Sequence, residues 1–362
     1  MRRGLLPLAA ATALLLAAGC GSAGGGDTNA APEGDGPTIA LFLPESKTTR
    51  YEAFDRPLFE AKVAQLCAEC SVLYSNADQD PAKQQSQVES ALTQGADVLV
   101  LDAVDASAVA PLVNQATQKN VPVIAYDRLI SGIAYEYYVS FDNVKVGEVQ
   151  GAALLEELNA RGTAASGQVV VINGSPTDPS AADYKQGAHN ALDGKVQIGR
   201  EFDTPDWSPD KAQQEMEQAI TAVGKGKIKG VYAANDGTAG GAIAAMKAAG
   251  MDPSQIPVTG QDAELAGVQR IVSGEQTMTI YLDLKAQAEK AAELAVALGR
   301  GERPPAPTTK NNGTADIPSF LLEPIAVDRD SIKDTIVADG FYSVDEICTP
   351  ELAAACAEVG LR

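Results

Sequence analysis

Short apolar runs alternate along most of the chain with longer stretches in which apolar residues recur every three or four positions. The short runs predict strands, at 38–43, 71–74, 97–101, 121–126, 137–141, 168–172, 196–202, 229–234, 256–260, 277–281 and 319–325. The longer stretches predict helices, near 53–67, 81–94, 107–119, 143–160, 179–192, 209–223, 238–249, 263–273 and 284–299. Between them, 303–318 is expected to be a loop. Strands rich in Val, Ile and Leu that alternate with helices are typical of a parallel sheet covered on both faces.

The alternation restarts near residue 168, and the two halves share one feature. VPVIAYD ends at Asp127 and IPVTGQD ends at Asp262, so each half has a strand that starts with an apolar residue and proline and ends in a carboxylate. The strand before each of these also ends in polar groups, at Asp102 and at Asn235-Asp236. Open parallel sheets bind ligands at the C-terminal edge of their strands. We therefore expect two similar doubly wound α/β lobes that present polar side chains to one cleft.

The first twenty residues read as an export signal. A basic start, Met1-Arg2-Arg3, is followed by an apolar stretch at 5–18 and by small residues that lead to Cys20. This order resembles a bacterial lipoprotein signal, in which the cysteine becomes the lipid-bearing N-terminus; an ordinary secretory signal is the alternative. We expect a signal peptide at 1–19, a lipidated Cys20 and a flexible, Gly-rich tether over 20–36. The protein would then be extracytoplasmic and held to the membrane by its lipid alone.

Four cysteines follow Cys20, and an even number outside the cytoplasm predicts two disulfides. They are Cys67, Cys70, Cys348 and Cys356. Three connectivities are possible, of which the two local pairs, 67–70 and 348–356, are the simplest. Redox chemistry is disfavoured for the Cys-x-x-Cys, because it ends a predicted helix and so lacks the helix N-terminus that lowers a thiol pKa.

Charge and motifs disfavour several function classes. The formal net charge of −20 includes Arg2 and Arg3, so it becomes −22 when the signal is removed. Such an acidic surface repels phosphate backbones, and nucleic acid is not an expected partner. His189 is the only histidine and has no metal-ligand spacing around it. With no nucleophile–base pair, metal set or phosphate loop in the sequence, we expect neither catalysis nor a cofactor.

Candidate binding residues stand at the predicted strand ends and in nearby loops. Hydroxyl groups of a saccharide require fixed planar donors and acceptors, and the C–H faces of its ring require a flat apolar surface. Side chains of both kinds are Arg50, Tyr51, Asp127, Arg128, Trp207, Asn235 and Asp262. Each taken alone has a structural alternative, such as capping a helix or packing in a loop. Their common placement at one edge of the predicted sheets favours a binding site.

Five segments carry a resemblance to a known family. They are VPVIAYDRLI (121–130), YYVSFDNVKVGEVQG (137–151), NGSPTD (173–178), ANDGTAGGAIAAM (234–246) and TGQDAELAGVQRIVSGEQTMTIY (259–281). The chain resembles the monosaccharide-binding proteins of bacterial ABC importers, and most closely those that bind xylose, from about residue 39 to 342. The resemblance implies the type I periplasmic-binding-protein fold, with two lobes joined by a three-strand hinge. It also implies a monomer that binds a sugar and docks on an ABC permease.

The resemblance further implies roles for particular residues. Arg50 would hydrogen-bond a hydroxyl, and Tyr51 and Trp207 would hold the ring between them, although the family usually has Trp where Tyr51 stands. Asp127 and Arg128 would bind vicinal hydroxyls from the first lobe.

Two more residues, Asn235 and Asp262, would bind hydroxyls from the second lobe. Two positions depart from the xylose-type pattern, because Leu282 stands where that pattern has Lys and Ser180 where it has Asn. The departures put xylose in doubt, but not sugar binding.

The same resemblance places the lobe boundaries and leaves a second role open. We expect an N-terminal lobe at 37–144 plus 280–316, a C-terminal lobe at 145–279 plus 317–345, and a tail at 346–362. The crossings that form the hinge would lie near 144–145, 279–281 and 316–319. Transport of D-xylose is the leading hypothesis. The alternatives are another monosaccharide (glucose, arabinose, ribose or galactose) or a sugar-sensing role in chemotaxis or signalling.

Overall fold

A computed structural model describes residues 36–362 of the chain. The expected signal peptide, the lipidation site at Cys20 and all but the last residue of the expected tether lie outside the described residues. Within 36–362, no helix combines the length and the apolar character that a membrane span requires.

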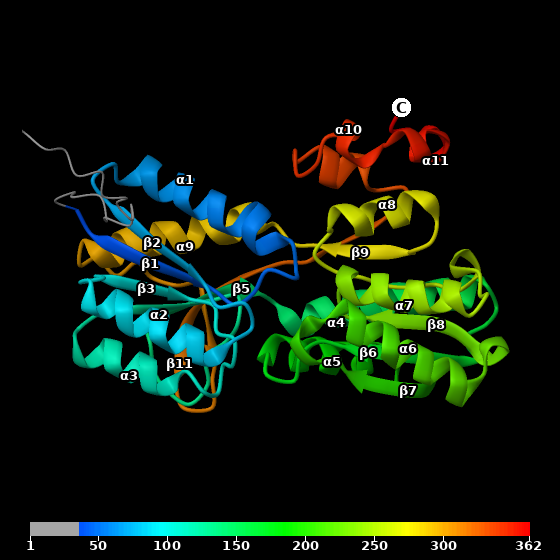
Figure 1. The fold of residues 1–362 in the computed structure, drawn as a ribbon, viewed down its shortest axis with the longest axis horizontal. Coiled ribbons are helices and arrows are strands. Elements are labelled where there is room, and N and C mark those ends of the chain that lie inside the picture. The colour runs from blue at the N-terminus through cyan, green and yellow to red at the C-terminus, as the bar shows by residue number, and fades with distance from the viewer. Residues whose placement is uncertain (1–35) are drawn as a thin grey trace, which may run out of the picture. The chain divides into compact units, whose positions relative to one another are not determined.

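The first lobe is built on a seven-stranded sheet with the strand order β10-β11-β5-β4-β3-β1-β2. Its strands are β1 (Thr38–Leu43), β2 (Ser71–Asn76), β3 (Val98–Leu101), β4 (Val123–Tyr126), β5 (Tyr137–Phe141), β10 (Thr308–Asn311) and β11 (Asp316–Leu322). All neighbours pair in parallel except β10 and β11. The helices of this lobe are α1 (Arg56–Leu66), α2 (Pro81–Thr93), α3 (Ala110–Gln118) and α9 (Leu284–Gly299). Two apolar clusters, one with α1 and α9 and the other with α2 and α3, bury the two faces of the sheet (Figure 1).

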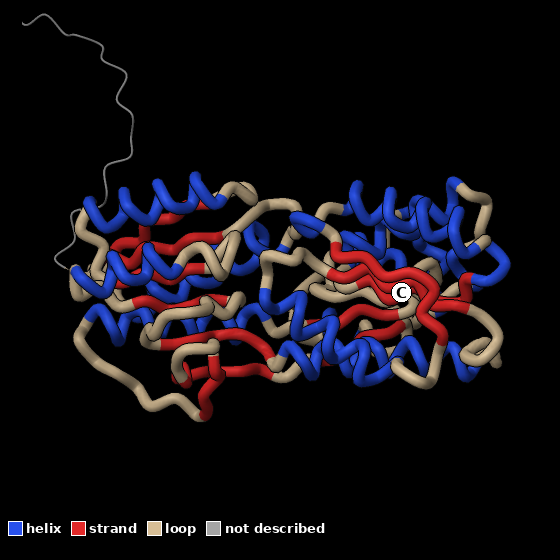
Figure 2. The backbone as a smooth tube through the Cα atoms, turned by 90° about the horizontal axis from the view of Figure 1, so that it is seen from below, coloured by secondary structure: helices blue, strands red, loops and turns tan. Residues whose placement is uncertain are grey.

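The second lobe has the parallel order β7-β6-β8 and a separate antiparallel pair, β12-β9. These strands are β6 (Gln168–Asn173), β7 (Gln197–Asp203), β8 (Ile228–Ala233), β9 (Met278–Tyr281) and β12 (Ile325–Asp328). The segment 258–262 joins the two groups, since Val258 bridges to β8 and the Ile280 N–H donates to the Gly260 carbonyl at 3.0 Å. The helices are α4 (Asn143–Ala160), α5 (Pro179–Leu192), α6 (Pro209–Val223), α7 (Asp236–Ala248) and α8 (Leu265–Ser273). Figure 2 shows the strands of each lobe as a layer between helices.

The last thirty residues form a packed cap and not a loose tail. Two short helices, α10 (Val344–Ile347) and α11 (Ala353–Glu358), lie against α8 (Figure 1). A disulfide joins Cys348 to Cys356, and both cysteines belong to an apolar cluster that includes residues of α8 and β9. The other disulfide joins Cys67 to Cys70 directly after α1. Of the three possible connectivities, the structure therefore has the one that pairs each cysteine with its neighbour in the sequence.

The predicted fold class is confirmed, and most predicted elements occur within a few residues of their expected bounds. Three predictions need correction. The expected strand 256–260 is only an isolated bridge at Val258, and the expected loop 303–318 contains β10. The expected strand 319–325 is two strands, β11 in the first sheet and β12 in the second, with Glu323 and Pro324 between them. Proline has no N–H for a strand ladder, which explains the break.

The chain crosses between the lobes at the ends of three strands. The crossings lie at 142 between β5 and α4, at 282–283 between β9 and α9, and at 323–324 between β11 and β12. The third differs most from expectation, because residues 317–322 extend the sheet of the first lobe and do not start the second. These strand ends bring the C-terminal edges of both sheets to the junction of the lobes.

Candidate functional site

The internal repeat seen in the sequence has the same local structure in both lobes. Asp127 follows β4 with a φ of 61°, and Asp262 follows the segment 258–261 with a φ of 85°. The Asp127 N–H donates to the Val139 carbonyl at 2.9 Å, and the Asp262 N–H donates to the Ile280 carbonyl at 3.0 Å. A left-handed backbone is uncommon outside glycine, although Asp tolerates it better than most residues. Each lobe thus uses a strained residue at a strand end to present a carboxylate.

Both carboxylates line a cavity with walls from the two lobes. The first lobe contributes Thr48, Arg50, Tyr51, Asp127 and Arg128, and the second contributes Asp178, Tyr184, Trp207, Asn235, Gln261 and Asp262. This lining combines charged and amide groups with aromatic rings, so it suits a small solute that carries hydroxyl groups.

Arg50 fixes the carboxylate of Asp127. Its Nη1 donates to Asp127 Oδ1 at 3.1 Å, while its Nε and Nη2 donate to Asp55 at 2.9 and 2.8 Å. The Tyr51 hydroxyl donates to the other oxygen of Asp127 at 3.3 Å. Burial would lower the pKa of Arg50, but Asp127 and Asp55 raise it well above its ordinary value. Arg50 therefore stays charged, and it holds Asp127 in one orientation.

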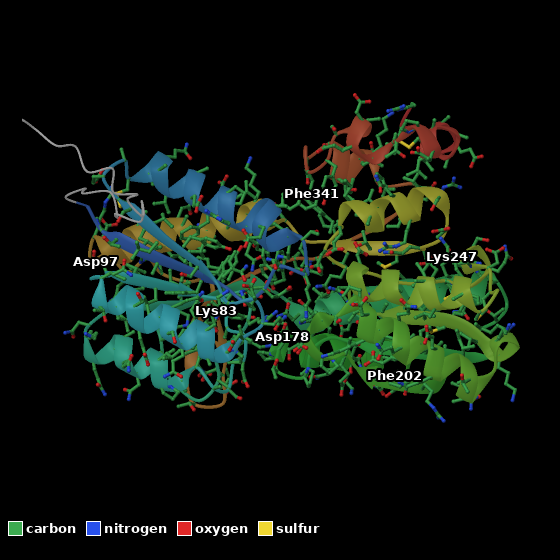
Figure 3. All side chains as sticks on the ribbon, in the orientation of Figure 1. Lys83, Asp97, Asp178, Phe202, Lys247 and Phe341 are labelled. Atoms are coloured by element: carbon green, nitrogen blue, oxygen red, sulfur yellow. A yellow bond between two sulfur atoms is a disulfide. The ribbon has the colours of Figure 1, made fainter. Side chains whose placement is uncertain are left out.

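Arg128 joins the two lobes. Its Nε lies 3.0 Å from Asp178 in the second lobe and 3.4 Å from Asp102 in the first, and its Nη1 donates to the Ala103 carbonyl at 3.0 Å. Asp178 lies where the two lobes meet in Figure 3. It also accepts a hydrogen bond from Trp207 Nε1 at 3.1 Å. As the N-cap of α5, it accepts a further one from the Ser180 N–H at 2.8 Å. Asp178 thus links a first-lobe guanidinium to the indole of the second lobe.

Trp207 is held in place by its backbone and by a glycine. The turn has positive φ at Asp206 and Trp207, 60° and 52°. The indole lies against Gly174, where a Cβ atom would come within 2.0 Å of Trp207 Cη2. Tyr184 meets the indole edge-on, with ring centroids 6.4 Å apart. Position 174 therefore requires glycine for the indole to reach the cavity.

The structure brings seven of the nine predicted ligand-binding residues to the cavity. The other two, Ser180 and Leu282, are not among the lining residues of the described chain. Ser180 lies behind Asp127, where its Oγ donates to the Asp127 carbonyl at 3.5 Å and accepts from Asn143 at 3.1 Å. Leu282 is 1 % exposed and packs in the apolar cluster of the second lobe that includes Trp207.

Sequence reasoning missed four lining residues as site residues. They are Thr48, Asp178, Tyr184 and Gln261. Asp178 precedes a proline that begins a helix, so the sequence suggests only a cap. Tyr184 lies on the inner face of α5, and a helical period marks a buried face without distinguishing core from cavity. Gln261 did have a signal, since it directly precedes Asp262 at a strand end.

Burial shifts the pKa of one carboxyl group in the second-lobe wall and of two behind it. It raises the pKa of Asp262 to about 6, that of Asp236 to about 7 and that of Glu264 to about 8. Asp236 accepts hydrogen bonds from Gln276, Thr279 and the Glu264 N–H at 2.6, 3.0 and 2.8 Å.

Within 36–362, no group of His, Cys, Asp and Glu side chains is placed to hold a metal ion.

These shifts predict that the protein loses stability as the pH rises. Unfolded Asp and Glu release their protons near pH 4, whereas the buried groups retain theirs up to about pH 6–8. The native state therefore binds more protons between pH 5 and 8, and its free energy of unfolding falls as the pH rises through these values. Melting temperatures at pH 5, 6, 7 and 8 measure the effect. Glu264→Gln is expected to flatten the fall between pH 7 and 8; a melting temperature that rises from pH 5 to 8 would contradict the assignment.

Comparisons with known proteins agree with this geometry. Residues 39–303 match the family model described as periplasmic binding protein domain. The D-xylose-binding periplasmic protein of Escherichia coli is 38% identical over 325 residues, which cover 88% of this chain and 95% of that protein. The D-xylose-binding periplasmic protein of Haemophilus influenzae is 37% identical, with 85% and 91% covered.

Other relatives are associated with other sugars. A multiple sugar-binding periplasmic receptor of Rhizobium radiobacter is 32% identical over 75% of this chain and 81% of its own length. An ABC transporter solute-binding protein of Clostridium phytofermentans, solved with bound β-D-glucose, has a TM-score of 0.78 and 29% identity, with 86% of this chain and 99% of that chain covered. The chain therefore belongs to the periplasmic binding protein family, among the sugar-binding proteins of ABC transport.

Proposed function

We propose that this protein is a lipid-anchored extracytoplasmic receptor that captures one monosaccharide, D-xylose first among the candidates, and delivers it to an ABC permease. The observation that carries the proposal is the cavity between the lobes, which has carboxylates from both lobes and an indole in its wall. The two relatives named for D-xylose support the choice of sugar. Glucose, arabinose, ribose and galactose are the other candidates.

The site can recognise hydroxyl groups because its polar side chains are fixed before the sugar arrives. Each guanidinium lies within 3.5 Å of two carboxylates, which hold it in one orientation. Tyr51 and Trp207 supply aromatic faces for the C–H groups of the ring. Closure of the lobes would exclude water and strengthen each of these hydrogen bonds. A ligand that favours the closed state by about 5.5 kcal/mol moves that state from 1 % to 99 % of the population.

Fluorescence of the only tryptophan tests the proposal directly. Titration of the mature protein with D-xylose, glucose, arabinose, ribose and galactose is expected to change the Trp207 emission for one or a few of them, saturating at one equivalent. The same sugars are expected to raise the melting temperature, because a ligand that binds only the folded state stabilises it. L-Glucose serves as a control of equal composition and opposite configuration. If no monosaccharide changes either the emission or the melting temperature, the proposal fails.

A further inference from the structure

Gln261 has an amide oxygen that the protein leaves unpaired. The side chain lines the cavity, and the residue is 3 % exposed. Its Nε2 donates to Asp262 Oδ1 at 3.4 Å. A carboxylate can only accept, so the amide must turn its NH₂ group, and not its oxygen, toward Asp262. Oε1 is then buried and has no hydrogen-bond partner among residues 36–362.

An unpaired acceptor in such a place indicates a missing donor. Buried polar side chains nearly always have a hydrogen-bond partner, and one left without a partner destabilises the protein. Among the described residues no neighbouring donor makes a hydrogen bond to Oε1, although the Asn235 amide and the Tyr184 hydroxyl line the same cavity. The Asn235 oxygen accepts from the Thr238 N–H at 2.9 Å as the cap of α7, which fixes the orientation of that amide. Leu282, behind the wall, carries no polar atom.

We propose that Gln261 is a ligand-binding residue whose Oε1 accepts a hydrogen bond from one sugar hydroxyl and so sets part of the specificity. The inference rests on the proposed monosaccharide site. Gln261 and Asp262 hold two acceptors side by side on the second lobe, an arrangement that fits hydroxyls on neighbouring carbons of one ring. The residue thus distinguishes a sugar that has a hydroxyl at this position from a sugar that lacks it.

Calorimetric titration of Gln261→Met against the wild type tests the assignment. Methionine keeps the length of the side chain but cannot accept a hydroxyl hydrogen with comparable strength. We expect the affinity for the sugar that binds most tightly to fall roughly 5- to 150-fold, as for a hydrogen-bonding group left without its partner. Gln255→Met is the matched control, because Gln255 is exposed in the same lobe and lies outside the cavity, and it is expected to leave the affinity unchanged.

A series of monodeoxy sugars separates a direct contact from a structural effect. The deoxy derivative that lacks the contacted hydroxyl is expected to bind the wild type more weakly than the parent sugar does, by a factor similar to that of Gln261→Met. The variant itself is expected to bind this derivative and the parent sugar equally, because the two changes remove the same hydrogen bond. Gln261→Glu retains an oxygen in this position and is expected to retain the discrimination. If the methionine variant melts too low to titrate, Gln261→Asn, whose oxygen is withdrawn by one methylene, is compared in the same way.

The possible failures are distinguishable. A wild type that binds no monosaccharide would overturn the proposed function. A wild type that binds sugar, beside a Gln261→Met variant that retains both the affinity and the full discrimination between deoxy derivatives, would overturn the role of Gln261 alone.

Discussion

Alanine in place of Asp262 is expected to weaken sugar binding by roughly 5- to 150-fold or more. The carboxylate lies in the cavity wall and is 6 % exposed, so a sugar hydroxyl that donates to it would lose its partner at a site largely shielded from solvent. Such a loss costs about 1–3 kcal/mol for one buried group. Asp262 also orients the Gln261 amide, so a second contact is weakened by the same change.

The stability of the Asp262 variants provides the control. Alanine tolerates a φ of 85° less well than Asp or Asn, which lowers the stability of Asp262→Ala. Removal of a carboxyl whose burial raises its pKa to about 6 partly offsets this loss above pH 6. Asp262→Asn retains the backbone preference and one carbonyl acceptor, so it is expected to fold normally and to lose less affinity. Calorimetry and thermal melting of both variants measure the two effects; wild-type affinity in Asp262→Ala would place the binding site elsewhere.

The sequence predicts the elements of this fold well because their hydrophobic periods are strong. The helices 143–160, 179–192, 209–223 and 284–299 occur at their predicted bounds. The sequence predicts strands less well where pairing with a distant strand, and not the local pattern, decides the conformation. The edge strand β10 is polar and exposed, and its pairing with β11 determines its conformation. The crossing at 323–324 separates two apolar segments that resemble one strand until their sheets are known.

The site shows the same limit at the level of single side chains. The repeated Asp at the strand ends is visible in the sequence, and the structure places both in one cavity. Side-chain direction is not visible. Leu282 follows β9 at the predicted edge, yet it packs into the core, whereas Tyr184 reaches the cavity from the middle of a helix. The local sequence pattern thus indicates which edge of the sheets carries the site. The packing of the folded chain decides which side chains at that edge line the cavity.

Methionine in place of Arg128 is expected to destabilise both the fold and the closed arrangement of the lobes. Arg128 is 1 % exposed and lies between Asp102 and Asp178, which are themselves buried. Removal of one partner of a buried ion pair costs about 3–5 kcal/mol, because the remaining charge has no compensation. Since Asp178 belongs to the second lobe, loss of the guanidinium also removes an attraction between the lobes. We expect a lower free energy of unfolding and weaker sugar binding.

The destabilisation by Arg128→Met is expected to shrink as the pH falls. Burial raises the pKa of Asp102 and of Asp178 even in the wild type, where Arg128 acts to lower both. Without Arg128 both pKa values rise further, so the two carboxyls are protonated more readily and their uncompensated charge disappears at low pH. Urea unfolding of the variant and the wild type at pH 5 and pH 8 measures this difference. Arg56→Met is the matched control, because the Arg56 side chain is 40 % exposed, pairs with Glu52 and Glu60 at the surface, and lies over the Tyr74 ring. An exposed pair contributes about 0–1 kcal/mol. Equal effects of the two substitutions would show that Arg128 does not compensate the buried carboxylates.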